Sequence, residues 1–137
     1  MQDELWRLVY ISQASHALSD AELADLLTVS RQRNQRDNIT GALAYHEQRF
    51  LQVLEGNCHL VEAVFDRICR DTRNCQQITI LRSPIPERAF DGWLMGWLPE
   101  EAVRRAGFDL RVLYTRVDML DVLDEIFIAF RTIGRPS

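Results

Sequence analysis

The sequence lacks the long apolar runs that mark a membrane-spanning segment. A helix needs roughly 20 predominantly apolar residues to cross a bilayer, and Asp124 and Glu125 interrupt even the apolar carboxyl-terminal segment. The first residues are acidic, and the apolar stretch behind them is broken by Arg7, so the basic-then-apolar order of a signal peptide is missing. We therefore expect a cytoplasmic protein without a membrane partner.

Cysteines are also few, and basic residues are outnumbered by acidic ones. Cys58, Cys69 and Cys75 are an odd number of thiols in a chain without an export signal, so we expect them to be reduced. Neither they nor the three histidines have the spacing of a metal site, and no metal is predicted. The formal net charge of −4 argues against a nucleic-acid partner, because phosphate backbones attract basic surfaces.

Common nucleotide-binding and acid–base motifs are absent as well. The six glycines form neither a Gly-x-Gly-x-x-Gly nor a Walker-type loop, so the sequence offers no glycine cradle for phosphate. Acidic residues are scattered over polar helix faces, and none stands alone in an apolar run as a catalytic carboxylate would. We therefore expect a protein that is not an enzyme.

The sequence has enough apolar residues for a core, and its first part gives clear secondary-structure signals. Apolar residues make up 47% of the 137 residues, enough for one compact domain. Residues 5–12 read as a strand that places Tyr10 and Ser12 on one face. Ser19 and Glu22 form a capping box that begins a helix, and we expect this helix to end near Asn34.

The remaining periodicity completes the fold prediction. Residues 39–45 and 50–56 form a hairpin, Asn57 caps a second helix, and residues 78–81 and 93–97 are further strands. The order βαββαββ predicts an α+β, ferredoxin-like fold: a mixed five-stranded sheet with two helices on one face. Residues 100–137 would supply C-terminal helices that cover the other face, unless their apolar stripe is a dimer surface.

Gln52 is the most informative single residue, because it interrupts the apolar run Phe-Leu-Gln-Val-Leu of a predicted strand. An unpaired buried amide costs about 1–3 kcal/mol, so Gln52 needs a protein partner or a ligand. From the pattern alone, a paired or edge-facing glutamine is the simpler interpretation. Tyr10 is likewise an ordinary strand residue, and Asn34 is ordinary near a helix end.

Four segments, taken together, resemble the BLUF family of flavin-binding blue-light sensors. The segments are Leu8-Val9-Tyr10-Ile11-Ser12, Arg33-Asn34-Gln35-Arg36-Asp37-Asn38-Ile39-Thr40-Gly41, Phe50-Leu51-Gln52-Val53-Leu54-Glu55-Gly56 and Phe90-Asp91-Gly92-Trp93-Leu94-Met95-Gly96. The resemblance covers residues 5–98 and rests on the order and spacing of all four. It implies a flavin-binding photosensory domain over residues 1–98, with residues 99–137 as a helical extension of the same compact unit that packs on the sheet or on a partner.

The resemblance also implies a site. Tyr10 and Gln52 match the family's photoactive pair, and Gln52 would lie between the Tyr10 hydroxyl and the flavin N5/O4 edge. Asn34 would bind the pyrimidine edge, and Ser12 would face the ring. Arg70, Asp71 and Arg73 match a segment near the ribityl and phosphate groups, although as a bare pattern they are typical of solvated surface.

Two further correspondences concern the signal and one ring contact. Trp93 and Met95 match the pair that relays the signal, and which of them lies near the flavin is left open. Arg33 stands where several relatives have His or Asn, so the contact on that edge is also open.

The implied function is a blue-light photoreceptor. Excitation of the flavin would drive reversible electron and proton transfer from Tyr10, and the rearranged Gln52 would signal to a separate, unidentified protein partner. FAD is the implied flavin, with FMN and riboflavin as alternatives, and we expect a homo-oligomer. Two other readings stay open: a catalytic flavoprotein, and a ferredoxin-like interaction module without pigment.

Overall fold

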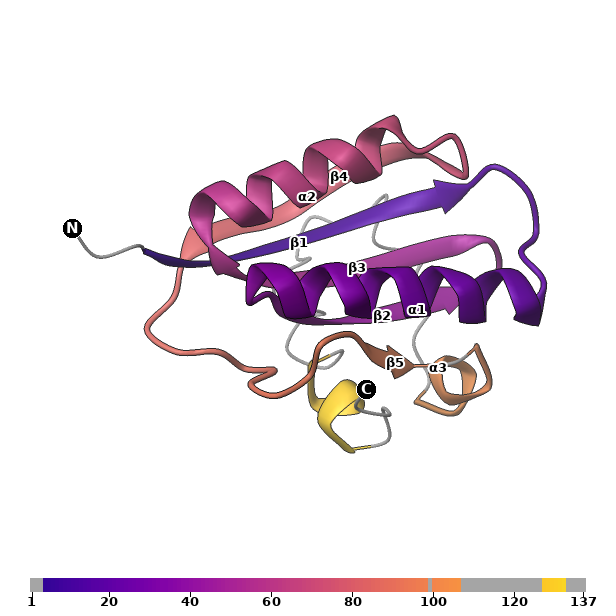
Figure 1. Cartoon of the computed structure of the whole chain (residues 1–137). Coiled ribbons are helices and arrows are strands. Elements are labelled where there is room, and N and C mark those ends of the chain that lie inside the picture. Colours follow the sequence, from indigo (N-terminus) through magenta and orange to yellow (C-terminus); the bar gives the residue numbers. More distant parts are fainter. Residues whose placement is uncertain (1–3, 99, 107–126, 133–137) are drawn as a thin grey trace.

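The computed structural model describes residues 4–98, 100–106 and 127–132 (Figure 1). One five-stranded sheet has the strand order β4-β1-β3-β2-β5. The strands are β1 (Leu5–Ala14), β2 (Thr40–His46), β3 (Arg49–Asn57), β4 (Asn74–Pro84) and β5 (Gly96–Leu98), and the helices are α1 (Asp20–Asp37), α2 (Cys58–Arg70) and α3 (Glu100–Ala106). β5 joins β2 in parallel, and the other strand pairs are antiparallel. The predicted α+β fold with a mixed sheet and βαββαββ order is confirmed.

Helix α1 begins as predicted but ends one turn later. Ser19 and Glu22 form the reciprocal capping box, with both hydrogen bonds 3.1 Å long. The predicted end near Asn34 is wrong, because Asn38 is the residue that adopts the left-handed conformation, with φ 54°. Asn34 therefore lies inside the helix, fully buried.

The hairpin and the second helix follow the sequence signals. Glu47 and Gln48 both have positive φ and form the two-residue turn between β2 and β3, as the right-handed twist of the flanking strands favours. The Asn57 side chain accepts hydrogen bonds from His59 and Leu60 N–H and so caps α2.

The last two strands differ from the prediction in their bounds. β4 begins at Asn74, four residues before the predicted start at Ile78. β5 begins at Gly96 rather than Trp93, because residues 90–93 form a turn. In this turn Trp93 N–H donates to Phe90 O at 2.9 Å and Gly92 has φ 85°, which glycine adopts without strain.

Strand alternation divides the core into two layers. On one face, Leu8 and Tyr10 of β1 pack with residues of α1 and α2, which run side by side over the strands (Figure 1). On the other face, Val9 and Ile11 pack with α3 and with residues 127–132. The C-terminal apolar stripe predicted from the sequence comprises Leu120, Leu123, Ile126, Phe127 and Phe130. Phe127 and Phe130 pack on this face of the sheet, and the other three lie outside the described residues. Within the described part of the chain, no helix is long and apolar enough to cross a bilayer.

Candidate functional site

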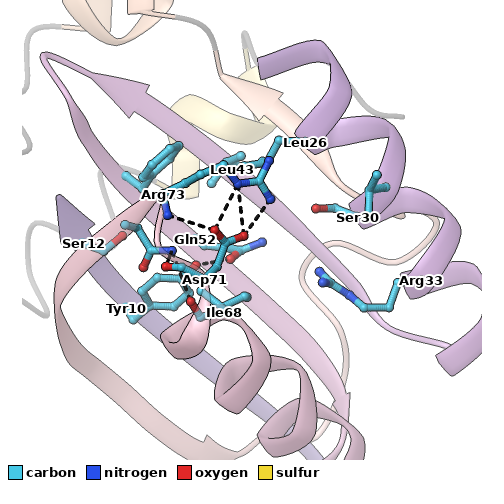
Figure 2. A pocket seen from close by; sticks show the side chains of 13 residues that line it. Tyr10, Ser12, Leu26, Ser30, Arg33, Leu43, Gln52, Ile68, Asp71 and Arg73 are labelled. Atoms are coloured by element: carbon cyan, nitrogen blue, oxygen red, sulfur yellow. Dashed lines mark hydrogen bonds and ion pairs between the residues drawn. The ribbon is translucent and has the colours of Figure 1, made fainter. Parts of the chain in front are cut away.

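A pocket opens between α1, α2 and the central strands of the sheet (Figure 2). The space between its lining side chains is about 500 Å³, a figure that includes open solvent at the mouth. Strand residues form the floor, and helix residues form the walls. The lining residues are Tyr10, Ser12, Leu26, Val29, Ser30, Arg33, Leu43, Phe50, Gln52, Ile68, Asp71, Arg73 and Asn74.

Tyr10 and Gln52 meet at the floor of this pocket. They are directly opposite in the β1–β3 register, so both side chains point to the helical face. Tyr10 Oη donates a hydrogen bond to Gln52 Oε1, and Gln52 Nε2 donates to Met95 Sδ at 3.6 Å. Each of the two side chains is only 3% exposed. Gln52 is thus the buried, partnered amide that its apolar context required.

Burial also determines the ionisation of Tyr10. Desolvation raises the pKa of the Tyr10 hydroxyl far above its ordinary value, and Cys69 and Asp71 add to this effect. The Arg33 guanidinium opposes it but does not outweigh burial. Tyr10 is therefore a neutral hydroxyl at physiological pH, with its proton directed at Gln52.

Three buried polar atoms at the site have no hydrogen-bond partner among the described residues: Ser12 Oγ, Arg33 Nε and Asn34 Oδ1. Asn34 uses its other amide atom, Nδ2, to donate to Leu94 O. Each unsatisfied buried group costs about 1–3 kcal/mol. Ser12 and Arg33 line the pocket, whereas Asn34 lies beside it and is not one of the lining residues. A ring with both donors and acceptors along its edge, such as the pyrimidine part of a flavin, fits these atoms.

Arg33 forms part of the wall that α1 contributes, and in Figure 2 its side chain extends toward the pocket. Burial lowers the pKa of its guanidinium, and the nearby Arg67 lowers it further. Because arginine stays protonated even so, Arg33 brings a positive charge to one side of the pocket.

Asp71 and Arg73 form an ion pair at the mouth of the pocket, between α2 and β4 (Figure 2). Arg73 Nη2 lies 2.6 Å from Asp71 Oδ2, and the Arg73 backbone N–H donates to Asp71 Oδ1 at 2.9 Å. The hydrogen bond from Arg73 lowers the pKa of the Asp71 carboxyl. Arg70 precedes this pair at the end of α2, and its side chain is exposed and does not line the pocket.

Trp93 and Met95 lie on opposite faces of the sheet. Met95 is fully buried in the cluster under α1 and α2, where its sulfur meets Gln52. Trp93 packs on the other face against Phe90, with ring centroids 5.5 Å apart. The sequence left open whether Trp93 or Met95 lies near the flavin; in the structure Met95 is the one of the two that contacts Gln52.

Sequence reasoning named Arg33, whose contact it left open, but it did not find the other residues of the pocket walls. Leu26, Ser30 and Arg33 share one face of α1 at spacings of four and three residues, and this was the available signal. Arg31 was also missed; its Nε donates to Met95 O at 3.1 Å. The other unpredicted lining residues are Val29, Leu43, Phe50, Ile68 and Asn74.

Comparison with protein families identifies the module. The family model for BLUF, sensors of blue light using FAD, matches residues 5–96. The chain belongs to the BLUF family.

Relatives of this chain are much longer proteins. A photoactivated adenylate cyclase subunit alpha from Euglena gracilis is 36% identical over 89 residues, which cover 65% of this chain and 9% of that protein. The subunit beta from Euglena longa is 30% identical over 130 residues, which cover 94% of this chain and 14% of that protein. This chain therefore spans only 9% and 14% of the length of these two relatives.

Solved structures agree with the fold. The dark-state structure of BlrB, a BLUF protein, has a TM-score of 0.83 at 26% identity and covers 95% of this chain and 97% of that one. A bacterial light-regulated adenylyl cyclase has a TM-score of 0.69 at 31% identity, and the match covers 94% of this chain and 35% of that one.

Proposed function

We propose that this chain is a blue-light photoreceptor in which Tyr10 and Gln52 are the photoactive residues and FAD is the pigment. The observation that carries the proposal is the buried hydrogen bond from Tyr10 Oη to Gln52 Oε1 at the pocket floor. Tyrosine donates both an electron and a proton, whereas an amide has a donor end and an acceptor end. Membership of the BLUF family supports pairing these two residues with a flavin.

A bound flavin would supply a light-absorbing ring that accepts an electron on excitation. Asn34, Ser12 and Arg33 would hold its polar edge, since each has a buried polar atom without a protein partner. Asp71 and Arg73 would meet the ribityl and phosphate groups at the mouth. FMN and riboflavin share the ring, and mass spectrometry of the released pigment distinguishes the three.

In the dark, Tyr10 keeps its proton, because the pKa of a tyrosine hydroxyl lies above physiological pH and burial raises the pKa of Tyr10 further. If Tyr10 gave an electron to the excited ring, its hydroxyl would become strongly acidic. Its proton would then pass to Gln52 Oε1, the acceptor of its hydrogen bond, and would return when the electron returns. Rotation or tautomerisation of the Gln52 amide during this cycle exchanges its donor and acceptor ends. The electron and the proton return to Tyr10, so there is no net redox change, and Gln52 differs only in its orientation or tautomer and in its hydrogen bonds.

The exchanged hydrogen bonds have a modest energy. Each is worth about 1 kcal/mol net, so the switch works by biasing an element already near balance. The segment that carries Met95 is this element, because Gln52 Nε2 donates a hydrogen bond to the Met95 sulfur. We propose that it passes the signal to a separate protein partner. The cyclase relatives contain the matched module within far longer chains, which supports an output that lies outside it.

The test is illumination of the purified protein loaded with FAD. We expect a small, reversible red shift of the flavin absorption band that is lost in Tyr10→Phe and in Gln52→Ala. Tyr45→Phe is the matched control, because Tyr45 is buried on the same face and its hydroxyl accepts from Leu18 N–H at 3.2 Å. This control should retain the shift.

Two outcomes would contradict the proposal. A protein that stays colourless with FAD would be an interaction module, and steady flavin reduction by a nicotinamide cofactor in the dark would indicate a catalytic flavoprotein.

A further inference from the structure

Glu55 is a buried carboxylate that the proposed photochemistry does not use. It lies on β3, three residues beyond Gln52 and on the opposite face, and it is 0% exposed. Arg7 Nε and Nη2 each lie 2.8 Å from its Oε2. The backbone N–H groups of Ala89 and Phe90 donate to its two oxygens at 3.0 and 2.9 Å. A buried charge is tolerated when it is paired in this way, and we call this group the Glu55 clamp.

The clamp holds one end of residues 88–95, the segment that leads to Met95. Next to it, Arg88 donates to Glu55 O and to Thr40 Oγ1, each at 2.9 Å. Further along, Trp93 O accepts from Gly41 N–H at 2.9 Å. These contacts tie the segment to β2 and β3 at several points.

The other end of the same segment lies at the candidate flavin site. Asn34 Nδ2 donates to Leu94 O, and Arg31 Nε donates to Met95 O. Gln52 Nε2 donates to Met95 Sδ. Residues 88–95 thus connect the two faces of the sheet, with the photoactive glutamine at one end and the Glu55 clamp at the other.

The clamp also contacts residues 127–132. The Arg7 guanidinium lies 5.2 Å from the centre of the Phe127 ring, a cation–π distance. Phe90, whose N–H is bound by Glu55, packs edge-on against Phe127 and Phe130 at centroid distances of 5.4 and 5.7 Å. One carboxylate therefore fixes two groups that both touch this C-terminal helical segment.

We propose that Glu55 is a positioning residue for signal output, a role that rests on the proposed photochemistry. Bonds to an ionised carboxylate are stronger than the single N–H···S contact at Met95. When Gln52 changes its hold on Met95, the segment therefore moves at its Met95 end and stays fixed at Glu55. Glu55 holds the backbone of Phe90, so the movement reaches residues 127–132 through the side chains of Trp93 and Phe90, whose ring centroids lie 5.5 Å apart.

The test is hydrogen exchange of the FAD-loaded full chain in the dark and under blue light, read at residues 127–132. In the wild-type protein we expect illumination to change exchange there. Glu55→Gln should keep the flavin red shift and reduce this light–dark difference at least fivefold, because one amide oxygen cannot accept from Arg7 and from both N–H groups. Glu62→Gln is the matched control. Glu62 forms an ion pair with Arg82 at 2.6 Å and takes no part in the clamp, so this variant should keep both signals.

A purely structural role for Glu55 would raise exchange equally in light and dark and leave the difference unchanged, which would overturn the proposal. The proposal would also be overturned if the wild-type protein showed the red shift but no light-dependent change in hydrogen exchange at residues 127–132. If Glu55→Gln fails to fold, Phe127→Leu is the second variant, because it removes the ring beside Arg7 and Phe90. This variant should abolish the light–dark difference in hydrogen exchange at residues 127–132. An unchanged difference in Phe127→Leu would also overturn the proposal. Absence of the red shift in the wild-type protein would instead refute the photoreceptor function itself.

Discussion

The functional interpretation of Tyr10 depends on Gln52, and that of Gln52 depends on Tyr10. A tyrosine in a strand needs no special explanation, whereas a glutamine within Phe-Leu-Gln-Val-Leu requires a partner. The β1–β3 register supplies that partner by placing Tyr10 directly opposite Gln52. Both residues had been predicted, but their contact follows from a pairing between strands that lie about forty positions apart in the chain.

Asn34 offers a residue-scale test of flavin binding. We expect Asn34→Ala to weaken FAD binding by about fivefold or more, because about 1 kcal/mol is lost with one hydrogen bond to the ring. Titration of the apoprotein with FAD, followed by quenching of flavin fluorescence, measures this. Gln35→Ala is the control, since Gln35 is the next residue of α1 and is exposed. Equal affinities for all three proteins would show that Asn34 does not contact the pigment.

At the scale of elements, β5 is short because the residues before it are used elsewhere. Trp93 turns back toward Phe90 and packs on one face, while Met95 points to the other. Gly96 permits this arrangement, because a Cβ at this position would lie 2.1 Å from Trp93 Cε3. Pattern reasoning placed a strand over residues 93–97, since apolar residues occur in a turn and in a strand alike.

We therefore expect Gly96→Ala to destabilise the fold by about 1–3 kcal/mol, the usual cost of overpacking a core. Chemical denaturation in urea measures the change in the free energy of unfolding. A double-variant cycle with Trp93→Ala is the internal control, because removal of the ring should relieve the clash and make the two effects non-additive. Additive effects would mean that the ring and the new methyl group do not compete for space.

For the whole molecule, we propose that the two faces of the sheet have different roles. The face under α1 and α2 holds the pocket, and the other face carries the Glu55 clamp, α3 and residues 127–132. Ile128 is 64% exposed on this helical segment, whereas its neighbours Ala129 and Phe130 are buried. An exposed isoleucine beside the proposed output route is a reasonable point of contact for a second copy or a partner.

We expect the protein to form a homo-oligomer that Ile128→Ser weakens, because this change removes apolar area from the contact. Light scattering after size-exclusion chromatography, in the dark and under blue light, gives the mass. Leu60→Ser on α2 is the control, with an apolar side chain that is 39% exposed. An oligomer unaffected by Ile128→Ser would locate the contact elsewhere on the molecule.

The sequence by itself determined the order of elements and the N-caps of the two long helices, and it singled out Tyr10 and Gln52 as the proposed photoactive residues, because these depend on local periodicity and on short motifs. It also showed that Gln52 needs a partner. Only the tertiary structure decided which face receives Met95, which polar atoms at the pocket lack partners, and that Glu55 binds Arg7 and residues 89 and 90. The physical reason is that strand register and long-range packing set these contacts, and neither leaves a local pattern in the chain.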